Sequence, residues 1–366
     1  MNRIQLKAIN RLGRKNIAMI VIALLLCAAP LFLSDFRTNL LGKFIAYAIL
    51  ALGIDLIWGY TGILSLGHGV YFGLGAYCMA MYLKLEADGG KLPDFMSWSG
   101  RDTLPWFWKP FGAAPVAILL AVLLPALIAL IIGYLTFKNR IKGVYFSILT
   151  QALSIIFVVL FVGQQEFTGG TNGITNFKTI FKFSLANNGT KLWLYYISVI
   201  LLVLAFIFCR FIINRRVGRV LIAIRDGENR ARFSGYNPTT YKVFVYCISA
   251  ALAGLAGAIY VPQVGIISPA EMGIVPSIEM VIWVAIGGRG SLTGAIIGAI
   301  LVNLLKSGVS EQFPAIWSYF IGIAFVVVVI FMPTGLVGAF NKIKGRLLKS
   351  EKNRQVKIEE AEILAE

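Results

Sequence analysis

Long apolar runs alternate with shorter polar stretches along most of the chain. An α-helix needs about 20 apolar residues to cross the hydrocarbon core of a bilayer. Ten runs are candidates for such spans: 17–33, 42–58, 66–83, 114–137, 144–162, 192–213, 243–262, 275–287, 291–306 and 315–337. The runs 275–287 and 291–306 are short enough to be half-spanning or broken helices. The pattern predicts an all-α fold, a polytopic transmembrane helix bundle with about 8–10 spans.

Basic residues gather on one side of these predicted spans. With the N-terminus inside and the spans alternating, 24 of the 34 Lys and Arg residues fall in inner segments and 10 in outer ones. Lys and Arg are biased toward cytoplasmic loops. Both the N- and C-termini are therefore predicted to be cytoplasmic. The two long outer loops, 84–113 and 163–191, are expected to be surface loops, with a lid or docking surface as the alternative.

The composition agrees with lipid as the main solvent of the chain. Of the 366 residues, 58% are hydrophobic and 14% are charged, whereas soluble domains are about half apolar and a quarter charged. The net charge of +17 follows from topology, because no stacking platform of aromatics accompanies the basic clusters; no nucleic acid is expected as a partner. The cysteines show no CxxC spacing and are expected to be small buried hydrophobes, so we predict no metal and no cofactor.

Polar segments between the runs are too short for a separate globular domain. We predict a basic cytoplasmic N-terminus at 1–16, a transmembrane domain at 17–340 and a cytoplasmic tail at 341–366. The run 17–33 resembles a secretory signal in outline. No clear cleavage site follows it, so we expect it to remain as the first helix.

The inner loop 214–242 combines apolar and charged positions in a helical pattern. Apolar residues recur at helical spacing at Val220, Leu221, Ile224 and Ala231. Charged residues take the other faces at Arg219, Arg225, Asp226, Glu228 and Arg230. This predicts a short amphipathic helix that ends near Gly235, because Pro238 prevents its continuation. Such a helix between two spans could pass a push from a cytoplasmic partner into the bundle, although a basic loop on anionic lipid explains the pattern equally well.

Few ionisable residues lie within the predicted spans. Asp55, His68 and Glu279 are the clear cases. A charge at membrane depth costs about 2.5–3.5 kcal/mol on insertion scales, so such residues are functional candidates. His68 is the only histidine in the chain. A histidine bonded to a carbonyl at a helix end is the simpler explanation for it.

Several stretches resemble one family of transport proteins. The run AIRDGENRARFSGYN followed by YKVFVYCISAALAGLAGAIY is similar to the coupling-helix region of permeases from branched-chain amino acid and urea ABC importers. Further similar stretches are GYTGILSLGHGVYFGLGAY at 59–77, RIKGVYFSILTQAL at 140–153, FTGGTNGITNF at 167–177 and GGRGSLTGAIIGA at 287–299. The resemblance covers most of residues 40–340.

Within that family, the pieces LPDFMSWSG, LPWFWKPF and RDGENRARFSGYNP look urea-type. The resemblance implies the second permease subunit of a urea or short-amide importer in the bacterial inner membrane, with a branched-chain amino acid importer as the alternative. It implies as partners a second, unlike permease, two cytoplasmic ATPases and an extracytoplasmic substrate-binding protein. Carried onto this chain, the helix 219–235 would couple to the ATPases through Arg225, Asp226, Glu228 and Gly235.

The chain contains no GxxxxGK[ST] motif, so it has no phosphate cradle of that type and is not expected to be an enzyme. Energy for import would come from another polypeptide. The candidates for lining a translocation path are Ser65, His68, Gln151 and Glu279. A passive channel would have no use for a cytoplasmic helix. A secondary transporter would need a chain of protonatable groups or an ion cage through the midplane, and three scattered residues are a thin basis for one.

Overall fold

The structure is a computed structural model that describes residues 18–312, together with 319, 322, 323, 326, 335, 336 and 338. The predicted terminal regions 1–16 and 341–366 lie outside the described residues, as does most of the run 315–337.

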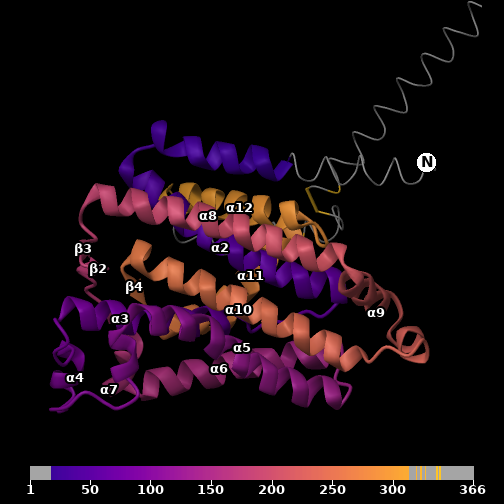
Figure 1. Cartoon of the computed structure of the whole chain (residues 1–366), viewed down its shortest axis with the longest axis horizontal. Helices are drawn as coiled ribbons and strands as arrows, with labels where there is room; N and C mark the ends of the chain where they lie inside the picture. Colours follow the sequence, from indigo (N-terminus) through magenta and orange to yellow (C-terminus); the bar gives the residue numbers. More distant parts are fainter. Residues whose placement is uncertain are drawn as a thin grey trace, which may run out of the picture.

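The described chain is built almost entirely of helices that run side by side (Figure 1). The α-helices are α2 Asp35–Thr61, α3 His68–Ala87, α4 Asp94–Trp98, α5 Ala114–Lys138, α6 Val144–Gly163, α7 Gln165–Thr168, α8 Asn188–Asn214, α9 Arg216–Phe233, α10 Pro238–Val264, α11 Ile274–Gly287 and α12 Leu292–Gln312. The 3-10 helices are η1 Ala29–Leu31, η2 Lys109–Gly112, η3 Gly170–Asn172 and η4 Pro269–Met272. The strands are β1 Ile174–Thr175, β2 Thr179–Ile180, β3 Phe183–Ser184 and β4 Ile266–Ile267.

Six helices in the described part of the chain are long and apolar enough to cross a membrane. They are α2, α5, α6, α8, α10 and α12. Ala18–Leu31 and α11 are shorter apolar helices. Helix α3 covers most of the predicted run 66–83 but is not one of the six. The predicted helix bundle is confirmed. The run 291–306, predicted to be short, belongs to a helix of 21 residues, whereas α11 has only 14.

The two ends of the bundle differ in what they carry. Helix α9 lies at one end, beyond the ends of α8 and α10, while α4, α7, β2 and β3 lie at the opposite end (Figure 1). Helix α9 contains five arginines, counting its first residue. Because basic residues favour the cytoplasmic side, we call the α9 end the inner end and the opposite end the outer end.

Burial separates central helices from lipid-facing ones. In α2, 89% of the most apolar 18-residue window is buried within the protein, and in α10 the share is 72%. The share falls to 28% in α5, 22% in α6 and 39% in α8. The exposed faces of α5, α6 and α8 can be apolar because they contact lipid tails instead of water. Helices α2 and α10 therefore form the core of the bundle.

Close backbone contact joins α3, α5 and α10. A Cβ atom added to Gly75 would collide with the backbone of Gly254, and one added to Gly254 would collide with the carbonyl oxygen of Ala121. A Cβ on Gly257 would meet the carbonyl oxygen of Phe72 in the same way. Small residues allow such approach between helices in a membrane, where packing replaces the hydrophobic effect as the driving force.

Two short strand pairs shape the outer end, and neither is predicted by the sequence pattern. Strand β1, from the outer loop 163–191, pairs antiparallel with β4, and Ile174 lies opposite Ile267. Strands β2 and β3 form a second antiparallel pair. Strands of two residues are too short to show an alternating pattern. The pairing of β1 with β4 fixes this loop to the end of α10.

Replacing Gly254 with Leu is expected to destabilise the bundle, because the new side chain would meet the α5 backbone, which cannot move aside as a flexible side chain can. Overpacking a core costs about 1–3 kcal/mol, so the thermal unfolding midpoint in detergent should fall. Gly163→Leu is the control, since nothing lies within 4 Å of a Cβ added there. An unchanged midpoint for Gly254→Leu would contradict this packing.

Candidate functional site

Helix α9 is amphipathic, as its sequence predicts. Val220, Leu221, Ile224 and Ala231 are all buried against the rest of the protein. The helix ends at Phe233, and Gly235 has a φ of +85°. The predicted end near Gly235 is therefore confirmed.

A break within α9 divides it into two arms. Gly227 has φ −175° and ψ 81°, which is not helical. The first arm therefore comprises residues 216–226 and the second comprises residues 228–233. The two arms contact different parts of the bundle.

The first arm is attached to the inner end of α2 by Arg225. Its Nη1 donates a hydrogen bond of 2.7 Å to the carbonyl oxygen of Gly59, and its Nε pairs with the Asp226 carboxylate at 2.9 Å. Gly62 closes α2 with a φ of +76°, and a Cβ there would lie 3.1 Å from the Arg225 side chain. The glycine therefore both ends the helix and leaves room for the arginine.

The same end of α2 holds the turn between α11 and α12. An oxygen of the Asp55 carboxylate accepts a hydrogen bond of 2.6 Å from the backbone N–H of Gly290. The Tyr60 hydroxyl donates to the carbonyl oxygen of Gly290 at 3.1 Å. Asp55, predicted as a functional candidate at membrane depth, thus has a partner in the fold.

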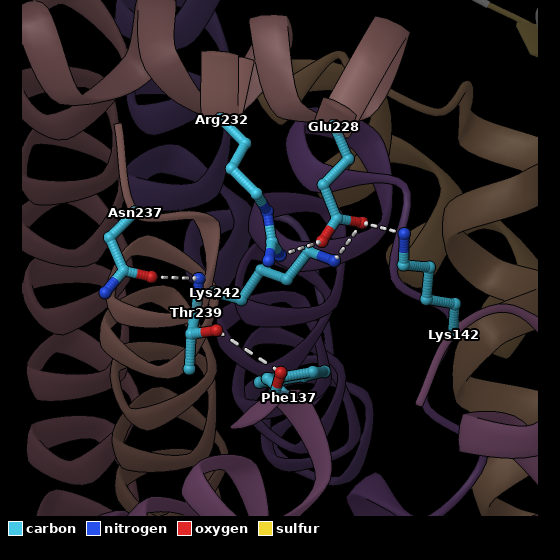
Figure 2. A network of polar contacts seen from close by, with 7 residues as sticks. All are labelled: Phe137, Lys142, Glu228, Arg232, Asn237, Thr239 and Lys242. Atoms are coloured by element: carbon cyan, nitrogen blue, oxygen red, sulfur yellow. Dashed lines mark hydrogen bonds and ion pairs between the residues drawn. The ribbon is translucent and has the colours of Figure 1, made fainter. Parts of the chain in front are cut away.

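The second arm is attached by Glu228, which faces three basic side chains (Figure 2). Its carboxylate lies 2.8 Å from Lys242 Nζ, 3.0 Å from Lys142 Nζ and 3.5 Å from Arg232 Nη2. Lys242 belongs to α10 and Lys142 to the loop between α5 and α6. The side chain of Glu228 is 15% exposed, so solvent screens these pairs less than it would at an open surface. Glu228 therefore joins three elements.

Electrostatics favour the ionised form of Glu228. Partial burial by itself raises the pKa of this carboxyl group, but hydrogen bonds from Lys242 and Lys142 and the charges of both outweigh it. The pKa of Glu228 therefore lies below its ordinary value of 4.5. Its contribution to stability is present above that ordinary value and is lost as the pH falls through the lowered pKa.

Of the four path candidates, Ser65 and His68 lie together in the core. His68 begins α3 and is fully buried. Its Nδ1 is 2.9 Å from the Ser65 hydroxyl and its Nε2 is 2.8 Å from the Ser249 hydroxyl. The histidine is thus bonded to two hydroxyl groups instead of the carbonyl considered from the sequence. The arrangement joins the start of α3 to α10.

The other two candidates lie apart from that pair in their contacts. Gln151 is half-buried on α6. Glu279 on α11 forms an ion pair of 2.6 Å with Lys306 on α12. Glu279 also lines a cavity together with Lys43 and Glu271, whereas Gln151 does not line that cavity. Sequence reasoning missed Lys43, Glu271 and Lys306, although ionisable residues beside apolar runs were the available signal.

Comparison with known proteins identifies the family. Residues 36–330 match the family model described as branched-chain amino acid transport system / permease component. The chain belongs to this family. The match extends from the second residue of α2 to the end of α12 and includes α9 and both of its attachments. No solved structure matches the chain.

Curated relatives of this permease component are also named as permease proteins of branched-chain amino acid transport systems. The high-affinity branched-chain amino acid transport system permease protein LivM of Escherichia coli K12 is 25% identical, over 88% of this chain and 75% of the relative. LivH from the same strain is 23% identical, over 80% of this chain and 91% of the relative. BraD of Pseudomonas aeruginosa is 22% identical, over 80% of this chain and 91% of the relative. With its six long apolar helices, the chain is a multi-pass protein of the bacterial inner membrane, as predicted.

The four predicted coupling residues of the permease divide into two kinds. Arg225 and Glu228 contact the bundle directly. The Asp226 side chain is 55% exposed, and Gly235 is exposed beyond the end of α9. The structure thus places all four at the inner end. Any contact with an ATPase stays a prediction, whereas the contacts of Arg225 and Glu228 with α2, α10 and the α5–α6 loop are observed.

The variant Glu228→Gln is expected to loosen the second arm of α9, because two lysines lose the charge of their shared partner. Amide hydrogen exchange should become faster over 228–233. In the unchanged permease the same loss of protection should occur only when the pH falls below about 4.5, after correction for intrinsic exchange. Glu166→Gln is the control, since Glu166 pairs with Arg101 at 2.7 Å at the outer end. Equal protection in both variants would refute this role.

Proposed function

We propose that this chain is one of two permease subunits of an ATP-binding-cassette importer for branched-chain amino acids. The family match over residues 36–330 and the names of the relatives support this proposal. The observation that carries it is the attachment of α9 to the bundle at two separate points. Cytoplasmic ATPases would supply the energy, since the chain has no GxxxxGK[ST] motif.

Helix α9 has the contacts that a coupling element needs. A displacement of its first arm would act on α2 through Arg225 and Gly59, and α2 in turn holds Gly290. A displacement of its second arm would act on α10 and on the α5–α6 loop through Glu228. Phe233, the last residue of α9, is 92% exposed. An exposed aromatic ring at this position is suited to contact with a partner protein.

The proposed assembly contains a second, unlike permease, two cytoplasmic ATPases and an extracytoplasmic substrate-binding protein. The chain is similar to both LivM and LivH of Escherichia coli K12, two differently named permease proteins of that organism. The likeness to LivM extends over more of this chain, 88% against 80%. This difference supports a LivM-type place in a pair of unlike permeases.

Urea is the second candidate substrate. The outer-loop pieces LPDFMSWSG and LPWFWKPF and the run RDGENRARFSGYNP favour it by resemblance, whereas the relatives named above all carry branched-chain amino acid transport in their names. The names of the relatives therefore support a branched-chain amino acid as the substrate, and transport of urea stays a prediction.

Vesicles that contain the complete importer, with its partner permease, ATPases and binding protein, test the proposed function. Radiolabelled leucine should accumulate only when ATP is present, and an ATPase variant that binds ATP without hydrolysing it should abolish the accumulation. Radiolabelled urea should not accumulate. Accumulation of urea in place of leucine would favour the second candidate. Uptake that persists without any ATPase would refute both importer assignments.

The variant Arg225→Ala should uncouple the importer, because α9 would lose its attachment to α2. A hydrogen bond to a charged group contributes about 1.5–3 kcal/mol, so ATP-dependent leucine uptake should fall about tenfold or more. ATP hydrolysis by the assembled complex should continue. Arg219→Ala is the control, since Arg219 is an exposed arginine on the same helix. Uptake that falls equally in both variants would show that charge on α9, and not this attachment, matters.

A further inference from the structure

An outer cavity lies between α2, α11, α12 and η4. Its volume is about 390 Å³, within the range of small-molecule sites. Five charged residues line its wall: Lys43, Glu271, Glu279, Lys306 and Glu311. Lys43 lies eight residues after Asp35, at the outer end of α2, which is about 12 Å along a helix. Charges at such depth in a membrane protein usually face a partner or a path for solutes.

These five charges are not all paired with one another. Glu311 accepts a hydrogen bond of 3.3 Å from the Ser307 hydroxyl. Glu279 and Lys306 form an ion pair of 2.6 Å. Within the described residues, Lys43 and Glu271 form no ion pair. The Lys43 ammonium lies 5.7 Å from the ring centre of Tyr47 and 5.5 Å from that of Tyr260, and the Tyr260 hydroxyl donates to Glu271 at 3.3 Å. Lys43 and Glu271 therefore face the cavity and attract each other, but without direct contact between them.

Aromatic rings complete the wall of this cavity. The ring centres of Tyr47 and Trp283 are 4.7 Å apart, and both residues line the cavity. Trp283 is only 2% exposed, yet its indole N–H has no hydrogen-bond partner among the described residues. A buried donor in a native structure normally has an acceptor.

We propose that this outer cavity is a transit site for a zwitterionic amino acid with an apolar side chain. Lys43 would face the carboxylate, Glu271 would face the ammonium group, and Tyr47 and Trp283 would contact the apolar side chain. Urea carries neither a charge nor an apolar side chain, so it would not compensate the two charges. The inference rests on the proposed function and adds to it a site within this subunit.

Charge-neutralising variants of the complete importer in vesicles test the site. Lys43→Met and Glu271→Gln should each lower ATP-dependent leucine uptake about tenfold or more at saturating binding protein, while basal ATP hydrolysis and the amount of assembled complex stay unchanged. Lys43→Arg should retain most of the uptake, because it keeps the positive charge. Glu166→Gln, which removes an exposed carboxylate at the same end, should have no effect.

Cysteine protection measures occupancy without transport. Ser307 is half-buried and lines the cavity, so a maleimide should label Ser307→Cys in the assembled importer. Leucine should slow the labelling and urea should not. Labelling at Gly163→Cys, on the exposed end of α6, should be insensitive to both.

The outcomes separate the two proposals. Leucine uptake by the unchanged importer, lost in Lys43→Met and Glu271→Gln, with protection by leucine, supports both. Leucine uptake that survives in both variants, or labelling of Ser307→Cys that leucine does not slow, overturns the transit site and leaves the proposed function standing. Uptake of urea but not leucine by the unchanged importer overturns both.

Discussion

Two other elements of the described chain are attached to the inner end of α2. The last carbonyl groups of any α-helix have no partner within the helix. At α2, the carbonyl of Gly59 is satisfied by the Arg225 guanidinium from α9, and four residues earlier the Asp55 carboxylate holds the N–H of Gly290. Helix α9 and the α11–α12 turn are therefore both attached to one helix end. That helix is the most buried of the candidate spans in the described chain.

The helices near these attachments are closely packed against one another. Gly254 on α10 lies against the α5 backbone, and Gly75 on α3 lies against Gly254. A close-packed interior transmits strain because it has few voids to absorb it. Glu228 connects α9 to this same unit through Lys242 on α10. A displacement at the cytoplasmic surface would therefore reach several helices together.

Charges serve different purposes at the two ends of the bundle. At the inner end, Glu228 meets three cations within 3.5 Å, and the group holds elements together. In the outer cavity, Lys43 and Glu271 face the same space and attract each other over a distance longer than that of an ion pair. A compact cluster of ion pairs stabilises a fold, whereas more widely separated charges at depth are retained where a ligand or water meets them. This contrast distinguishes the inner attachment from the proposed solute site.

The sequence by itself determined the helix bundle and the amphipathic helix α9, because hydropathy and helical spacing are local properties of a chain in lipid. It did not predict the break at Gly227 or the pairing of Ile174 with Ile267. Only the tertiary structure decided which charges lie near one another: Glu228 and Lys142 form an ion pair, and Lys43 and Glu271 line one cavity, although both pairs are far apart in sequence. Such partners depend on how distant helices pack, which no local pattern records.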